Sequence, residues 1–250
     1  MILKNLSFSF QFVTAWKIKK ALKSLSNKKS TAIDQLDNYS VKLASDFISG
    51  PLHHIITLSL MQEKFPSSWK LTKIVPLHKK KSPLCKENYR PVAIISPLSK
   101  ILEKVIFEQI YEYFERNALF DSSLHGYRAN RSTLTALLTM YDKWVSAASR
   151  GKYTGVVLAD LSAAFDLVCP NLLAKKLEVY GFQEDTIKWI LSYLTERFQT
   201  VWINHVYSDY VENSMGVPQG SNLGPLFLPQ DYSSLSVNMN FSANCLNTLR

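Results

Sequence analysis

The sequence predicts an α+β protein in which a mostly helical first half is followed by an incomplete sheet. Apolar residues recur at helical spacing in residues 13–25, 97–113 and 132–148. Short β-branched or alternating runs, typical of strands, occupy residues 71–77, 92–95, 154–158 and 198–215. With 250 residues and 46% apolar content, the chain is long enough for a large core and one or two domains.

The chain is basic, with a net charge of +9 and a pI near 9.3. This charge favours a polyanionic partner such as nucleic acid, or an anionic membrane surface, although a basic protein without such a partner also fits. Cys85, Cys169 and Cys245 form no CxxC pair, so neither a zinc site nor a disulfide framework is indicated. No membrane span or signal-peptide core is evident, and we expect an intracellular chain, in the nucleus or cytoplasm.

Five helical segments are expected before residue 150. The first covers residues 13–25, and residues 38–63 form two more that break at Gly50 and Pro51. Ser96 and Pro97 open the next one as cap and first helical residue. Ser132 caps a further helix with one apolar stripe, which we assign to the core: Leu134, Leu137, Leu138, Tyr141, Trp144, Val145 and Ala148.

Basic residues gather in two places. The strands at 71–77 and 92–95 are joined by a loop with Lys79, Lys80, Lys81 and Lys86, which is followed by Arg90. Such a hairpin can lean over an anion, because Lys supplies a mobile charge and Arg a planar fork matched to phosphate. The alternative is a solvated charged loop. A second, smaller basic patch is formed by Arg128 and Arg131.

Residues 153–166 read YTGVVLADLSAAFD, and the rest of the chain is organised around them. The pattern predicts a buried strand that delivers Asp160 at its carboxyl end and then turns into helix. A strand places a metal-binding carboxylate with little freedom, which suits chemistry on phosphates. An Asp that caps the next helix is the alternative interpretation.

In the last third of the chain, the pattern predicts helices over residues 170–180 and 184–196 and a β-hairpin over residues 198–215. Gly181 ends the first of these helices. Residues 216–226 read GVPQGSNLGPL. Three glycines and two prolines around Gln219 indicate a backbone held close to another segment. Residues 232–250 contain no Asp or Glu and show no clean period, so we expect them to be poorly packed or disordered.

Four stretches, NYRPVAIIS, HGYRANRST, LADLSAAFD and MGVPQGSNLGPL, occur in an order and spacing that resemble the reverse transcriptases of non-LTR retrotransposons of the LINE or jockey-like type. The match runs from about Phe8 to Leu226. The resemblance implies a right-hand polymerase with mostly helical fingers and an incomplete antiparallel palm sheet. It divides the chain into an N-terminal helical extension (1–35), a fingers-like region (36–152), a partial palm (153–226) and a divergent, poorly ordered tail (227–250).

The resemblance also implies RNA template, DNA primer and dNTP as partners, and two Mg²⁺ ions between carboxylates and the incoming triphosphate. Asp160 matches the first metal-binding catalytic carboxylate, and the backbone carbonyl of Leu161 matches a further metal ligand. Phe165 matches the steric gate that selects deoxynucleotides. Gln219 and Gly220 match the turn beside the nucleotide.

Lys79 and Arg90 match the fingers residues that hold the triphosphate. Asp166 belongs to the same pattern, and we interpret it as a structural residue or a helix cap. Four further cations are candidates for contact with nucleic acid: Lys80, Lys81, Arg128 and Arg131.

The chain departs from the family pattern after Leu226. The family carries a second catalytic motif, YADD or FADD, about 30 residues after this turn, and here Asp231 stands alone. A shifted frame, a misjoined exon or a decayed copy would each produce such a break, and the two-ion site is then incomplete. We therefore expect a catalytically incomplete RNA-directed DNA polymerase fragment. The alternatives are a non-catalytic nucleic-acid-binding remnant and a fragment without function.

Overall fold

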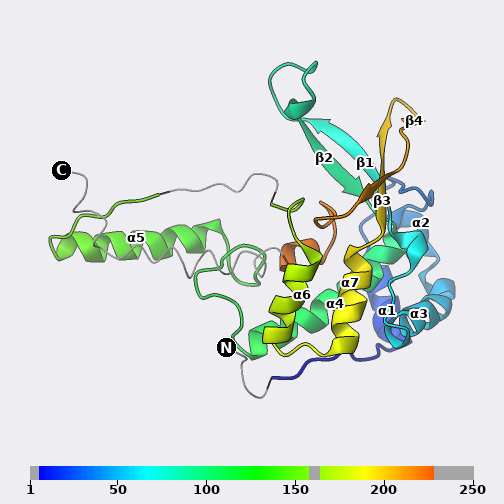
Figure 1. Cartoon of the computed structure of the whole chain (residues 1–250), viewed down its shortest axis with the longest axis horizontal. Coiled ribbons are helices and arrows are strands. Elements are labelled where there is room, and N and C mark those ends of the chain that lie inside the picture. The colour runs from blue at the N-terminus through cyan, green and yellow to red at the C-terminus, as the bar shows by residue number, and fades with distance from the viewer. Residues whose placement is uncertain (1–5, 158–163, 228–250) are drawn as a thin grey trace.

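The computed structural model describes residues 6–157 and 164–227. In Figure 1 a body of helices carries a sheet on one side, and α5 extends away from both. The helices are α1 (Ala15–Lys23), α2 (Asn38–Leu43), α3 (Ser45–Met61), α4 (Pro97–Arg116), α5 (Thr133–Ser149), α6 (Pro170–Val179) and α7 (Glu184–Leu194). The strands are β1 (Leu71–His78), β2 (Tyr89–Ile94), β3 (Arg197–Ile203), β4 (Val206–Tyr207) and β5 (Val211–Asn213).

The helix α4 lies at the centre of the core. It begins as the sequence predicts, because the Ser96 side chain accepts from the Leu98 N–H at 3.2 Å and Pro97 takes the first position. Its apolar residues are almost fully buried: Ile101, Leu102, Val105, Ile106, Ile110 and Phe114. The N-terminal segment packs into the same core through Ile18 and Leu22 of α1. The helix α1, which lies within the predicted N-terminal extension, therefore packs against the folded body.

The sheet has the order β2-β1-β3-β4, and β5 also pairs with β3. The predicted hairpins are confirmed, since β1 with β2 and β3 with β4 are antiparallel. The expected antiparallel sheet is wrong at one place, because β1 and β3 run parallel, with Leu71 opposite Phe198. Parallel neighbours need a long crossover, and here α4, α5, α6 and α7 all lie between the two strands in sequence.

The predicted helix break at Gly50 and Pro51 is also wrong. The helix α3 continues through both residues, and the break falls at Ala44, between α2 and α3. Proline removes one hydrogen bond from a helix interior. Here Leu52 and Ile56 are buried on one face of α3, and this packing keeps the helix together.

The predicted burial of the α5 stripe is wrong, although the helix itself is confirmed. Ser132 and Thr135 form a reciprocal cap, and the helix runs to Ser149. None of its described residues is buried, and Leu137 is 56% exposed. Figure 1 shows the reason, since α5 stands apart from the other helices and no described element covers its apolar face.

The strand predicted at residues 154–158 is wrong for the part that the structure describes. Residues 152–157 are irregular, and Val157 is 74% exposed. A single strand without a neighbour leaves its backbone N–H and C=O groups without partners. None of the described strands pairs with residues 154–157. Asp160 and Leu161 lie outside the described residues, as does the tail 228–250. Within the described ranges, none of the helices has the length and apolar character needed to span a bilayer.

Candidate functional site

The turn at residues 216–226 is held against the segment that contains Phe165. The Val217 N–H donates to the Phe165 carbonyl at 2.8 Å, and the Gly216 N–H donates to the Val168 carbonyl at 2.8 Å. Gly216 has φ of +86°, and a Cβ there would lie 2.7 Å from the Asp166 Cα. Only glycine satisfies both the backbone angle and the close approach.

The same turn is held on its other side by β2. The Ala93 N–H donates to the Gln219 carbonyl at 3.0 Å. Gly220 has φ of +126°, and a Cβ there would lie 2.8 Å from the Ala93 carbonyl oxygen. The prediction that this glycine-rich backbone lies close to other segments is confirmed at Gly216 and Gly220.

A cavity of about 330 Å³ opens between the turn and one face of the sheet. Gln219 and Pro218 line it from the turn, Pro91 and Ala93 from β2, and Asp166 from the segment before α6. Thus residues from three segments far apart in sequence share one cavity. Phe165, the neighbour of Asp166 in sequence, does not line the cavity; its side chain is partly buried against the core, 3.5 Å from where a Cβ on Gly224 would lie.

Asp166 is not a helix cap, which corrects the sequence interpretation. The cap of α6 is Cys169, and its side chain forms no capping hydrogen bond. Partial burial raises the pKa of the Asp166 carboxyl, although the residue stays exposed to solvent overall. Its place in the cavity wall makes it a polar group available to a ligand.

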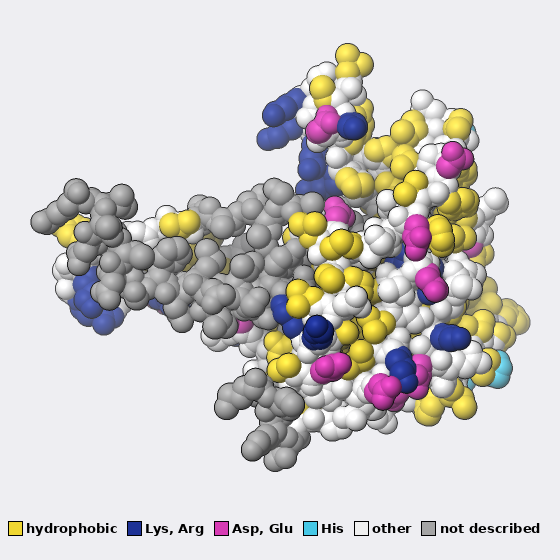
Figure 2. Space-filling model, in the orientation of Figure 1, with side chains coloured by type: hydrophobic (Ala, Val, Ile, Leu, Met, Phe, Trp, Pro, Cys, Tyr) yellow, Lys and Arg dark blue, Asp and Glu magenta, His cyan; other side chains and the backbone are white. Residues whose placement is uncertain are grey.

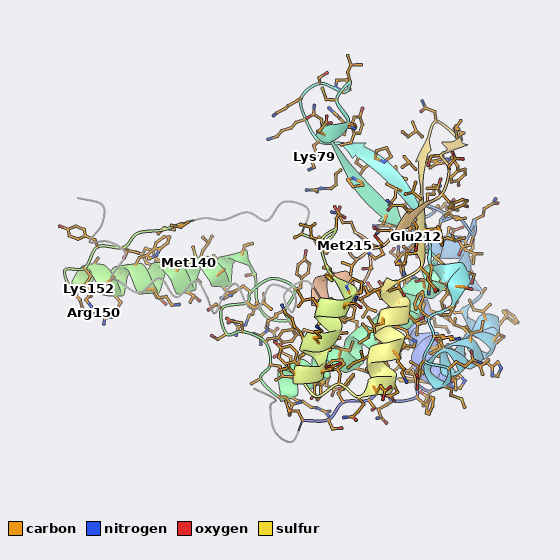
Figure 3. All side chains as sticks on the ribbon, viewed as in Figure 1. Lys79, Met140, Arg150, Lys152, Glu212 and Met215 are labelled. Carbon is orange, nitrogen blue, oxygen red and sulfur yellow. The ribbon has the colours of Figure 1, made fainter. Side chains whose placement is uncertain are left out.

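The other predicted nucleotide contacts are not brought to this cavity. Lys79 follows β1, where its N–H donates to the Asn88 carbonyl at 2.9 Å, and its side chain is exposed. Arg90 pairs with Leu77 and lies on the face of β2 opposite to Pro91 and Ala93. Figure 3 shows Lys79 on the hairpin, apart from Met215 at the start of the turn.

The hairpin cations form an exposed group that we call the hairpin cluster. Figure 2 shows dark blue side chains gathered on this part of the surface. Within the described parts of the chain, no ion pair is formed by any member of the cluster, which comprises Lys79, Lys80, Lys81, Lys86 and Arg90. Their charges are therefore available to an external anion.

The second basic patch is engaged within the protein. The Arg128 guanidinium donates to both carboxylate oxygens of Glu115, at 3.1 and 2.8 Å, and its side chain is only 11% exposed. This pairing lowers the pKa of Glu115. Arg131 donates to the Ser122 carbonyl at 2.6 Å. Both residues order the irregular segment before α5, and their contact with nucleic acid stays a prediction.

The described residues do not assemble a metal centre. No three His, Cys, Asp or Glu side chains gather anywhere in residues 6–157 and 164–227. At the cavity Asp166 is the one carboxylate that the structure describes. A pair of Mg²⁺ ions requires several oxygen ligands, so these residues alone do not fit it.

Two buried charged residues near the turn were not predicted from the sequence. Glu103 of α4 is 0% exposed and is bonded to Asn222 of the turn, and Arg197 of β3 is 2% exposed and lines the cavity beside Gln219. A signal for Glu103 was present, because it falls among the apolar positions Leu102, Val105 and Ile106 of a helix expected to be buried.

Comparison with known proteins agrees with this arrangement. Residues 77–230 match the family model described as reverse transcriptase (RNA-dependent DNA polymerase). The chain belongs to the reverse transcriptase family. The matched region of this family member contains β2, α4 and the whole turn, and it includes the residues that line the cavity except Thr72 and Ile74 of β1.

Three curated relatives of this reverse transcriptase chain come from transposons or mobile elements of Drosophila melanogaster. It is 29% identical over 229 residues to the probable RNA-directed DNA polymerase from transposon BS, a match covering 89% of this chain and 24% of that relative. It is 29% identical over 223 residues to the RNA-directed DNA polymerase from mobile element jockey, covering 88% and 24%. It is 28% identical to the probable polymerase from transposon X-element over 206 residues, covering 80% and 22%.

These matches confirm the resemblance to reverse transcriptases of non-LTR retrotransposons. The family's α+β character is also confirmed, with helices and a mixed sheet. The chain spans about a quarter of the length of the curated relatives it matches.

Proposed function

We propose that this chain supplies the nucleotide-binding part of a retrotransposon RNA-directed DNA polymerase. One observation carries the proposal: the turn with Gln219 is hydrogen-bonded to both Phe165 and Ala93. Three segments to which the resemblance assigns one nucleotide site thereby meet at a single cavity.

In this proposal the ring of Phe165 crowds the ribose 2′ position and favours deoxynucleotides. Gln219, which lines the cavity, and its neighbour Gly220 border the bound nucleotide. Lys79 and Arg90 hold the triphosphate when the hairpin leans toward the turn, since both cations are exposed. Residues 36–152 act as fingers and 153–226 as part of the palm. Residues 1–35 are an extension and 227–250 a divergent tail.

Asp160 and the Leu161 carbonyl are the proposed ligands for Mg²⁺, together with the phosphates of the dNTP. Bound metal would neutralise charge on the triphosphate and activate the primer hydroxyl. The described residues of this chain contribute positioning of the nucleotide, which is a large part of phosphoryl-transfer catalysis.

Within these 250 residues no two aspartates are adjacent, so we propose that this chain alone does not extend a primer. Primer extension on an RNA template with labelled dNTP tests this. We expect no product above that of Asp160→Asn, a variant lacking the proposed first carboxylate. Templated incorporation by the wild type that the Asp160→Asn variant loses would show that the chain is active and refute the inactivity.

A second candidate function, non-catalytic binding of nucleic acid, is favoured by the unpaired hairpin cluster. Phosphate neutralisation releases counterions, so affinity should fall steeply with salt and depend little on sequence. The double variant Lys80→Gln with Lys81→Gln should reduce the slope of log K against log salt by about 2 on hybrid duplex. Lys188→Gln removes a cation already paired with Glu184 at 2.8 Å and is the matched control. Equal slopes for all three proteins would argue against the cluster as the contact.

A further inference from the structure

A carboxylate lies completely buried beneath the turn that carries Gln219. Glu103 is 0% exposed and projects from the middle of α4. One of its oxygens accepts from the Ser99 hydroxyl at 3.0 Å, one helical turn earlier. The other accepts from the backbone N–H of Asn222 at 2.8 Å. One carboxylate thus joins the central helix to the turn.

A second contact fixes the same point of the turn. The Asn222 side-chain amide donates to the Lys100 carbonyl of α4 at 3.0 Å. Asn222 is therefore held through both its backbone and its side chain by residues of a helix that lies in the core.

The charge of Glu103 is partly balanced inside the protein. Burial raises the pKa of the carboxyl, whereas the Asn222 N–H and the nearby Arg197 guanidinium oppose that rise. Arg197 is 2% exposed and donates to the Tyr193 carbonyl at 2.9 Å. Among the described residues, its Nη2 and the Tyr193 hydroxyl have no hydrogen-bond partner. An apolar side chain of similar size could fill the volume that the Glu103 side chain occupies, often without loss of stability. Filling volume therefore does not explain why a carboxyl group stands at this position.

The segment between Gln219 and Asn222 is short, and hydrogen bonds within the turn stabilise it. The Ser221 N–H donates to the Pro218 carbonyl at 3.0 Å, and the Gly224 N–H donates to the Ser221 hydroxyl oxygen at 3.0 Å. On the side of the turn that faces β2, the Gln219 carbonyl accepts a hydrogen bond from the Ala93 N–H. We therefore expect a displacement of the Asn222 backbone to displace Gln219 as well, because only two residues separate them and the segment is hydrogen-bonded within itself.

We propose that Glu103 is a positioning residue for the nucleotide site, whose hydrogen bond to Asn222 orients Gln219 and Gly220 toward the nucleotide. The role in nucleotide binding rests on the proposed function; the hold on the turn does not. The hydrogen bond from the Asn222 N–H to Glu103 is 2.8 Å long and joins the helix to one backbone position of the turn, which suits a positioning contact.

The first test measures amide hydrogen exchange in the full chain. Glu103→Gln keeps the size of the side chain but replaces the carboxyl acceptor by an amide and so weakens the bond to the Asn222 N–H, and exchange of residues 219–222 should rise about fivefold. Exchange at Ile106 and Ile110 of α4 should stay unchanged. Ser99→Ala is the matched control, since it removes a hydrogen bond to the same carboxylate but leaves the Asn222 contact.

Two results in this test would overturn the proposal. One is turn exchange within about twofold of the wild type in Glu103→Gln. The other is an equal rise in α4 and the turn, which would mark Glu103 as a general stability residue. Glu103→Ala should enlarge the effect on the turn; should it fail to fold, Glu103→Gln decides the question alone.

The second test measures affinity for dATP with Mg²⁺. Glu103→Gln should weaken binding about fivefold, and Ser99→Ala should not change it. In a Gln219→Ala background Glu103→Gln should have no further effect, because the group it positions is gone. Unchanged dATP affinity despite faster turn exchange, or additive effects of the two substitutions, would contradict the positioning role. If the wild type binds no dATP, the proposed function fails separately, and the exchange data still decide whether Glu103 holds the turn.

Discussion

Single residues decide the geometry of the turn. Gly216 and Gly220 adopt backbone angles that other residues rarely adopt, and both approach neighbouring backbone within van der Waals distance. These positions explain why the stretch 216–226 is rich in glycine. They also allow the turn to bond to Phe165 through Val217 and to β2 through Gln219, which is the basis of the proposed site.

Gly216→Ala should destabilise the fold by about 2–4 kcal/mol. About 1–2 kcal/mol comes from the left-handed backbone angle and the rest from overpacking against Asp166. Urea unfolding of the purified chain measures this. Gly126→Ala is the control, because nothing lies within 4 Å of the added Cβ, and it should change stability by less than about 0.5 kcal/mol. Similar values for the two variants would show that the close approach at Gly216 is not real.

Most elements could be predicted from local sequence. Caps and turn residues mark α4, α5, α6 and the β3–β4 hairpin, and these signals act within a few residues. The contact between Gln219 and Ala93 joins residues 126 positions apart, and a periodic pattern carries no such information. The family resemblance predicted that the turn and the segments of Phe165 and Arg90 belong to one site. The glycines explain physically how the backbone of the turn can lie so close to its neighbours.

Burial of a helix face was harder to predict than the helix. The stripe on α5 has the period of a core-facing helix, and yet it is exposed in the described structure. Periodicity reports that a face is apolar, whereas its partner is set by tertiary arrangement. The parallel pairing of β1 and β3 escaped prediction for the same reason, since it depends on the path of the crossover.

This difference between α4 and α5 gives a direct comparison of two leucines. Leu102 is 0% exposed in α4, and Leu102→Ala should lower the free energy of unfolding by about 2–5 kcal/mol. Leu137 is 56% exposed in α5, and Leu137→Ala should change it by less than about 0.5 kcal/mol. Chemical denaturation of both variants measures the contrast. A loss at Leu137 as large as at Leu102 would mean that the α5 face is buried in solution.

The whole molecule combines a packed helical body with a cationic hairpin and a glycine-rich turn. The body holds the turn from two sides, through β2 and through α4. The hairpin carries positive charge that pairs with none of the described carboxylates, in a chain of net charge +9. These features suit a protein that binds a triphosphate and a nucleic-acid backbone together. The family match over residues 77–230 places this arrangement among reverse transcriptases.

Phe165 and the turn with Gln219 are proposed to form one nucleotide site, and the ratio of the affinities for dATP and ATP is the measurement that tests this site. Equilibrium titration with Mg²⁺ should show a wild-type preference for dATP of about tenfold or more. Phe165→Val should abolish that preference with little effect on dATP. Gln219→Ala should weaken both nucleotides alike. Equal wild-type affinity for dATP and ATP, or a preference that survives Phe165→Val in a folded protein, would contradict the account.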